Sequence, residues 1–295
     1  MIPLDKDLQT VKHNLEEFAG ITRRVLQYLP NVISGVHVKN DYKIFSSEIA
    51  GTVKYIRPIN QTLFIDTTED FMRSFENLKV IFEKIRLKQQ LTGREKKTID
   101  STLYTIQQSV GAGLDLLVNP NSARKHVGNR FEELIKTVFI EIGISNKKIV
   151  LKIPYETEEG TKSYKCENDL VLSPFEKVKS SSESINKDEV VVSIKTTSKD
   201  RMGKMFIDKM LLERFIGHPQ KVIGIFLNDV QRKGSNNIGF TLVSGLFMVY
   251  SRFLTELEGV YYLDPPPAVG KKPFSNYMKP FSELITKDIS RLLSS

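Results

Sequence analysis

The chain has 295 residues, of which 40% are apolar and 26% charged, so it can form one large domain or two smaller ones. A single cysteine, Cys166, excludes an internal disulfide, and no apolar run is long enough to span a bilayer. The formal net charge of +8 suits a polyanionic partner, although many lysine-rich proteins are basic without binding DNA. The first 18 residues are amphipathic and mixed in charge, unlike a signal or transit peptide, so a cytoplasmic protein is expected.

Helical spacing of apolar residues dominates the first 119 residues. The first predicted helix ends at Pro30 or breaks near Gly20, and a later one follows a sequence that resembles an N-terminal cap at 66–69. We therefore expect a separate all-helical N-terminal domain over residues 1–119. The predicted helices are residues 4–30, 46–56, the amphipathic stretch that follows 66–69, and 92–117.

The pattern changes in the second half, where residues 120–295 are expected to form one domain. A helix over 121–143 is followed by short β-like runs, and the polar, serine-rich segment 173–188 is expected to be a surface loop. An amphipathic helix over 281–293 closes the chain. This succession indicates an α/β (α+β) fold. The predicted strands are 147–155, 163–172, 189–195, 221–227, 238–250 and 259–264.

Three charged residues stand in a fixed order along this half: Glu132 on the predicted helix, Asp169 on a strand and Lys195 at the end of the next strand. Metal-dependent hydrolysis of a phosphodiester needs these residue types, because carboxylate oxygens hold Mg²⁺ and the metal activates a bound water. A lysine can orient that water and offset the charge that develops on the phosphate. Each residue alone is most simply a surface charge, but their order and spacing together favour a nuclease.

This order resembles the PD-(D/E)xK nuclease superfamily, and in detail the type II restriction endonucleases that recognise CCGG or CCNGG. The resemblance covers about residues 122–263 and implies a mixed central sheet flanked by helices. The triplet here is Ser193-Ile194-Lys195, with serine where the usual motif has an acid, and Asn168 precedes Asp169 where the motif has proline. The group that this variant resembles takes the missing acid from the following helix.

The resemblance implies a role for each acid. Asp208, thirteen positions after Lys195, matches the relocated acid, with Glu213 as the alternative. Asp169, Asp208 and Glu132 would bind Mg²⁺, and Lys195 would position the attacking water. Glu132 is preferred over its neighbour Glu133, because the helical projection places Glu132 nearer the Gly128 side.

A charged triplet, Lys199-Asp200-Arg201, follows four to six positions after Lys195. Arg or Lys can donate to guanine O6 and N7 in the major groove, and an acid can accept from cytosine N4. The triplet resembles the Arg-acid-Arg element with which the CCGG and CCNGG enzymes read DNA, with lysine in place of the first arginine. Lysine lacks the rigid fork of arginine, so its contact would be weaker or directed at phosphate. A helix start with mixed charge for solubility is the alternative.

Together these features, with the resemblance, predict a Mg²⁺-dependent type II restriction enzyme that cuts double-stranded DNA at a short palindromic site containing CCGG. A palindrome implies a homodimer, or a higher oligomer, in which each subunit cuts one strand. A cognate DNA methyltransferase is expected in the same system without direct contact, and no membrane partner is expected. The N-terminal domain would serve dimerisation or DNA contact. The alternatives are a structure-specific or repair nuclease of the same superfamily, and a non-catalytic DNA-binding or scaffold protein.

Overall fold

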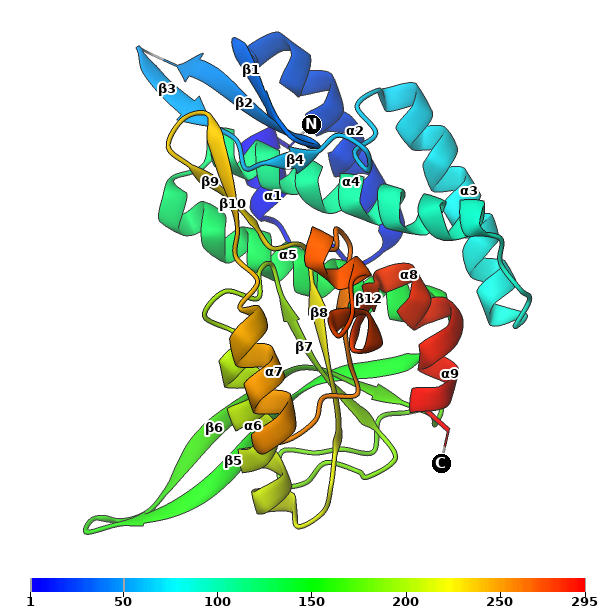
Figure 1. The fold of residues 1–295 in the computed structure, drawn as a ribbon, viewed down its shortest axis with the longest axis vertical. Coiled ribbons are helices and arrows are strands. Elements are labelled where there is room, and N and C mark those ends of the chain that lie inside the picture. Colours follow the sequence, from blue (N-terminus) through cyan, green and yellow to red (C-terminus); the bar gives the residue numbers. More distant parts are fainter. Residues whose placement is uncertain (1, 50, 295) are drawn as a thin grey trace.

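The computed structural model describes residues 2–49 and 51–294, and its centre is a six-stranded sheet with the order β12-β11-β8-β7-β6-β5 (Figure 1). The pairs β5–β6 and β6–β7 are antiparallel, whereas β7–β8, β8–β11 and β11–β12 are parallel. The mixed central sheet flanked by helices is therefore confirmed. The strands are β5 (Ser145–Thr157), β6 (Gly160–Ser173), β7 (Val190–Lys195), β8 (Lys221–Phe226), β11 (Gly259–Tyr262) and β12 (Met278–Pro280).

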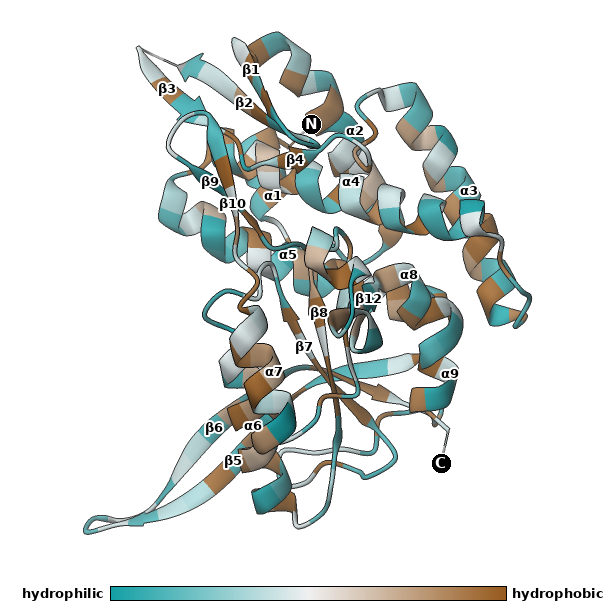
Figure 2. Cartoon of the chain, viewed as in Figure 1, coloured by the Kyte–Doolittle hydropathy of each residue, from teal (hydrophilic) through white to brown (hydrophobic). Residues whose placement is uncertain are grey.

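The central strand β7 is apolar on both faces because helices cover both sides of the sheet. Val192 and Ile194 belong to one buried cluster and Val191 to another. Figure 2 shows the hydrophobic residues that run along β7 and β8. On the first face lies α5 (Pro120–Glu141), and on the second lies α6 (Met202–Ile216), which connects β7 to β8.

A β-bulge interrupts the long hairpin of β5 and β6, whose turn projects from the body of the molecule (Figure 1). Lys147 pairs with Val171 and Ile149 pairs with Asn168, so two residues of β6 lie opposite the single residue between them on β5. One of these two residues is Asp169. Bulges of this kind re-aim side chains and are frequent next to active sites.

The N-terminal part is not all helical, which corrects the prediction. Within the stretch 46–56, expected as a helix, residues 46–49 and 52–55 lie in strands of a small antiparallel sheet. Burial alternates at the start of β2, where Tyr42 and Ile44 are buried, and Asn40 adopts a φ of 53° in the turn before it. Period-two burial and a tight asparagine turn favour a hairpin over a helix. The strands are β1 (Gly35–Lys39), β2 (Tyr42–Ile49), β3 (Thr52–Tyr55) and β4 (Ile59–Asn60).

The other predicted N-terminal helices are present. The first expected helix is divided before Asn14, which caps the second piece, rather than near Gly20. Thr67 caps α3, and Thr92 with Glu95 forms a capping box at the start of α4. The helices are α1 (Leu4–Gln9), α2 (Leu15–Val32), α3 (Thr68–Arg86) and α4 (Gly93–Leu117).

One hydrophobic core joins the N-terminal helices to the central sheet. The predicted boundary at residue 119 falls between α4 and α5, and both helices contribute to this core. Separate folding of the first 119 residues stays a prediction. Members of the core cluster include Phe18, Val25, Phe71, Phe75, Leu103, Ile106, Phe131, Leu134, Leu170, Val190, Val192, Ile194, Ile223 and Ile225.

The remaining C-terminal elements differ from the prediction at one place. The apolar run 238–250 was expected as a single strand, but only its start is extended, and a helix begins at Ser244. A continuous apolar run suits either structure, so periodicity does not separate them. The elements are the hairpin β9 (Val230–Lys233) and β10 (Asn237–Phe240), α7 (Ser244–Phe253), α8 (Phe281–Glu283) and α9 (Ile289–Leu292).

The serine-rich segment 173–188 is irregular, as expected. The buried carboxylate of Glu189 anchors this segment by accepting hydrogen bonds from the backbone N–H groups of Lys179 and Ser180.

In the part of the chain that the structure describes, no helix combines the length and the apolar character that crossing a bilayer requires.

Candidate active site

Asp169 and Lys195 meet where β6 and β7 lie side by side. Lys195 Nζ is 2.5 Å from Asp169 Oδ2, and the backbone N–H of Ile194 donates to the same oxygen at 2.8 Å. The Asp169 side chain is 9% exposed and that of Lys195 is 30% exposed, so the pair lies at the rim of the core. The second carboxylate oxygen, Oδ1, takes part in neither contact. The structure therefore brings these two candidate site residues together.

The helix α5 brings Glu132 to the same lysine. Glu132 Oε1 is 3.8 Å from Lys195 Nζ, and Oε2 is 3.7 Å from Lys148 Nζ on β5. Lys148 also lies 3.5 Å from Glu167 Oε2. Burial, and next the negative charge of Asp169, raise the pKa of Glu132, while Lys195 and Lys148 oppose this rise. Glu132 and Asp169 are thus close enough for each carboxylate to feel the charge of the other.

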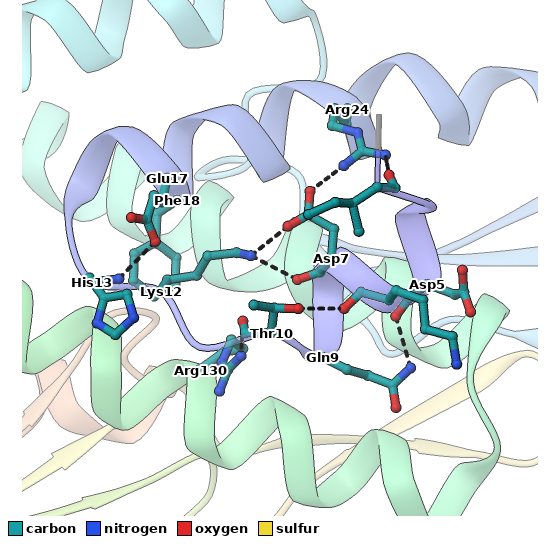
Figure 3. Close-up of polar contacts among 12 residues, drawn as sticks. Asp5, Asp7, Gln9, Thr10, Lys12, His13, Glu17, Phe18, Arg24 and Arg130 are labelled. Atoms are coloured by element: carbon teal, nitrogen blue, oxygen red, sulfur yellow. Dashed lines mark hydrogen bonds and ion pairs between the residues drawn. The ribbon is translucent and has the colours of Figure 1, made fainter.

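Glu133 has a different place and role. Its Oε1 pairs with Arg130 Nη2 at 2.5 Å, and its Oε2 accepts from the backbone N–H of Lys12 at 2.9 Å. Arg130 is 2% exposed and also donates to the carbonyl of Thr10 (Figure 3). Glu133 therefore fastens the segment between α1 and α2 to α5, and the geometry favours Glu132 for the site.

Glu213 lies outside the site, contrary to the alternative assignment. Its Oε1 accepts from the backbone N–H of Gln220 at 2.9 Å. The next residue, Lys221, pairs with Val190 at the start of β7, whereas Lys195 is at the end of that strand. Six residues of extended chain span about 20 Å, and Glu213 is at the far end of that length. The last turn of α6 lies away from Asp169 and Lys195, because α6 runs back along the sheet.

Asp208 is in an ion pair with Lys204 on the exposed side of α6, and both carboxylate oxygens lie 2.6 Å from Lys204 Nζ. The helix places it near β6, since burial and then the negative charge of Asp208 raise the pKa of Cys166. The structure does not bring Asp208 to Asp169 and Lys195. Its assignment as the third acid stays a prediction.

Asp169 and Glu132 are the carboxylates that could hold a metal at this place. Within residues 2–49 and 51–294, no three His, Cys, Asp or Glu side chains are grouped to hold a metal ion. Mg²⁺ usually takes one or two protein carboxylates and completes its octahedron with waters and substrate phosphates. Two carboxylates near each other beside a lysine fit this demand.

The triplet Lys199-Asp200-Arg201 lies exposed in the turn from β7 into α6. Asp200 has a φ of 59°, in the left-handed region, and Arg201 is the N-cap residue of α6. Lys199 Nζ is 3.4 Å from Gln231 Oε1 on β9. The triplet therefore lies shortly after the end of β7 and presents its side chains to solvent.

Asp229 holds this turn in place, although the sequence alone does not mark it as part of the site. It is 1% exposed and accepts hydrogen bonds from Thr197 Oγ1 at 3.0 Å, from Ser198 N and Oγ at 2.7 Å, and from Tyr262 OH at 2.8 Å. The one signal in the sequence is a polar Asn228-Asp229 pair at the end of a buried strand. The sequence does not mark Lys148 and Glu167 either, because each is one of several charged residues in the strands of the β5–β6 hairpin.

No protein-family model matches the sequence, and no curated protein matches it. Among solved structures, the type IIP restriction endonuclease Kpn2I is similar with a TM-score of 0.72 and 17% identity, over 95% of this chain and 91% of that chain. The restriction endonuclease PspGI in complex with substrate DNA aligns with a TM-score of 0.43 and 12% identity, over 76% of this chain and 92% of that chain. The similarity to Kpn2I extends over the N-terminal part as well as the central sheet, and it shows that the chain has the restriction-endonuclease fold.

Proposed function

We propose that the protein is a Mg²⁺-dependent, sequence-specific endonuclease of double-stranded DNA, of the type II restriction kind. One observation carries the proposal: Asp169, Glu132 and Lys195, which are predicted to form a hydrolytic site, converge at one edge of the sheet. The fold shared with a type IIP restriction endonuclease supports it, and the net charge of +8 suits a DNA partner.

Each residue has a defined part in this chemistry. Asp169 and Glu132 would hold Mg²⁺, which supplies charge stabilisation at the phosphate and lowers the pKa of a bound water. Lys195 donates to Asp169 and lies beside Glu132, so its ammonium group can orient an attacking water and offset charge on the phosphate.

Asp208 remains the proposed third acid. It would reach the site only after leaving Lys204, four residues before it on the same exposed face of α6. Surface pairs at this spacing contribute about 0.3–0.5 kcal/mol, so the loss of this ion pair opposes the movement only weakly. The spacing of thirteen positions after Lys195 is the support for this assignment.

Recognition would use the exposed triplet. Lys199 and Arg201 would donate to guanines and Asp200 would accept from cytosine, which suits a short palindrome containing CCGG. A palindromic site implies a homodimer with one active site for each strand. A methyltransferase that protects the host site would accompany such an enzyme. The N-terminal helices and the small sheet would contribute to dimerisation or to DNA contact.

Digestion of a DNA of known sequence with Mg²⁺, followed by sequencing of the fragment ends, tests the proposal. A restriction enzyme gives discrete fragments with 5′-phosphate ends, and EDTA abolishes them. Smeared products, or cuts only at junctions and flaps, would indicate a structure-specific nuclease instead. If the wild type cuts no DNA, the catalytic proposal fails.

A further inference from the structure

The hairpin of β9 and β10 starts from the same anchor as the triplet Lys199-Asp200-Arg201. Asp229, which binds Thr197 and Ser198 just before the triplet, is also the residue before β9. Thr241, which follows β10, donates its backbone N–H to the Asp229 carbonyl at 2.9 Å and its hydroxyl to Oδ1 at 3.3 Å. Because one buried carboxylate binds both segments, the hairpin and the triplet are held in a fixed mutual position.

The two faces of this hairpin have different surroundings. On one face, Arg232 lies over the ring of Tyr55 at 4.6 Å, and Phe240 packs edge-on against Tyr42 with 6.1 Å between ring centroids. These contacts fasten the hairpin to the small N-terminal sheet, and Figure 1 shows it running beside β3. Strand alternation and the observed register put Gln231, Lys233 and Asn237 on the other face.

The second face of the hairpin lies beside the triplet. On this face, Gln231 is the residue nearest to Asp229 in the strand, and its Oε1 lies 3.4 Å from Lys199 Nζ. A glutamine oxygen has two lone pairs, and an ammonium group has three donors. The contact with Lys199 therefore leaves one Oε1 lone pair, the whole amide NH₂ and two lysine protons available to DNA.

The geometry points to a second reading element: Gln231, presented by the β9–β10 ribbon, contacts the base pair directly outside the G·C pairs read by the triplet, and selects adenine there. This inference rests on the sequence-specific DNA recognition in the proposed function. The major groove admits a two-stranded β-ribbon. Glutamine pairs with adenine by accepting from N6 and donating to N7. The contact of Lys199 with Oε1 favours an amide with its oxygen toward the triplet. Asn237 and Lys233 complete a polar face without an acid.

Binding of short duplexes tests the inference without any need for cleavage. The duplexes carry the G·C core found by digestion, or CCGG if nothing is cut, and differ only in the pair outside the core on both sides. Fluorescence anisotropy of wild type without metal is expected to show tighter binding for one duplex, with A·T at that pair. For Gln231→Ala, this preference is expected to fall by about 5- to 150-fold while binding of the other three duplexes changes little.

Gln90→Ala is the matched control and should leave every affinity unchanged, because Gln90 is exposed in the segment that joins α3 to α4, and the end of α3 lies on the opposite side of the molecule from β9 and β10 (Figure 1). The inference is overturned if wild type binds the four duplexes equally, or if Gln231→Ala weakens all four by the same factor, since that is the signature of a phosphate contact. A melting temperature equal to that of wild type checks the fold of Gln231→Ala. Discrimination without cleavage would contradict the catalytic proposal and leave this one standing.

Discussion

Lys195 Nζ and Asp169 Oδ2 lie 2.5 Å apart although 26 residues separate them in the chain. The contact forms because β6 and β7 are neighbours in the sheet. The bulge also changes which side chains of β6 point to each face of the sheet. Cys166 packs on the α6 face, whereas Leu170, four residues later and of the same parity, packs on the α5 face. Asp169, at the bulge, is thereby directed to Lys195 and Glu132.

Replacing the lysine tests its catalytic part. For Lys195→Ala, we expect DNA cleavage to slow by about 10²- to 10⁴-fold, because no ammonium group remains to orient the water. DNA binding should stay near wild type. Single-turnover cleavage at saturating enzyme measures the chemical step. Lys187→Ala, an exposed lysine of the loop before β7, should cut at the wild-type rate. An unchanged rate in Lys195→Ala would remove Lys195 from the mechanism.

Neighbouring glutamates on α5 should respond in opposite ways. Glu132→Gln is expected to lose at least about 10²-fold in cleavage without loss of stability, because the carboxylate it removes is partly buried beside Asp169. Glu133→Gln should keep its activity and lose about 1–3 kcal/mol in the free energy of unfolding, since buried Arg130 loses its charged partner. Urea denaturation measures the free energy of unfolding of both variants, and cleavage rates measure their activity. Equal effects in both assays would contradict the assignment of Glu132.

Two variants distinguish the proposed catalytic role of Asp208 from its ion pair with Lys204. Asp208→Asn should reduce Mg²⁺-dependent cleavage by at least about 10²-fold if Asp208 joins the site, and should change stability by less than about 0.5 kcal/mol. Lys204→Ala removes the partner and should leave activity equal or higher, because Asp208 is then free to move. Cleavage rates over a Mg²⁺ titration measure both effects. Wild-type activity in Asp208→Asn would remove this residue from the mechanism.

The proposed role of the triplet Lys199-Asp200-Arg201 in reading DNA leads to a prediction about DNA affinity. Arg201→Ala should weaken binding of the cognate site by about 1–3 kcal/mol and relax specificity at one G·C pair, because a bidentate guanine contact is lost. Its side chain is exposed, so the melting temperature should not change. If Lys199 contacts phosphate, Lys199→Ala should weaken all sequences alike and lower the salt dependence of binding. Binding isotherms at several salt concentrations distinguish these outcomes.

A buried carboxylate predicts a dependence of stability on pH. Burial raises the pKa of Asp264 to about 6, although hydrogen bonds from Asn60 and Tyr42 oppose the rise. The folded chain therefore binds more protons than the unfolded chain between about pH 4 and pH 6. The stability contributed by Asp264 is present below about pH 4 and is lost as the pH rises through about 6.

Comparison with Asp264→Asn isolates this effect. The free energy of unfolding of wild type relative to the variant should fall as the pH rises from 4 to 7, by at most about 1.4 kcal/mol per pH unit. Chemical denaturation at each pH measures it. A difference that does not vary with pH would mean that Asp264 keeps one charge state in the folded and unfolded chains.

The sequence by itself determined the local elements and the chemical types of the site. The cap-like sequence at 66–69 and the apolar stripe of α5 placed these two helices, because a helix forms from contacts a few residues apart. The order of Glu132, Asp169 and Lys195 indicated metal-dependent hydrolysis, because few reactions need those residue types together. The resemblance to a known family then gave the mixed sheet that the structure confirms.

Only the tertiary structure decided which side chains meet. The β2 and β3 strands were missed because their stability comes from pairing across the sheet and from the common core, not from local spacing. Glu213 was misplaced because α6 runs back along the sheet, so distance along the chain did not report distance from Lys195. The bulge at Asp169 and the anchoring of two segments by Asp229 depend on register and burial, which exist only after strands far apart in the chain have packed together.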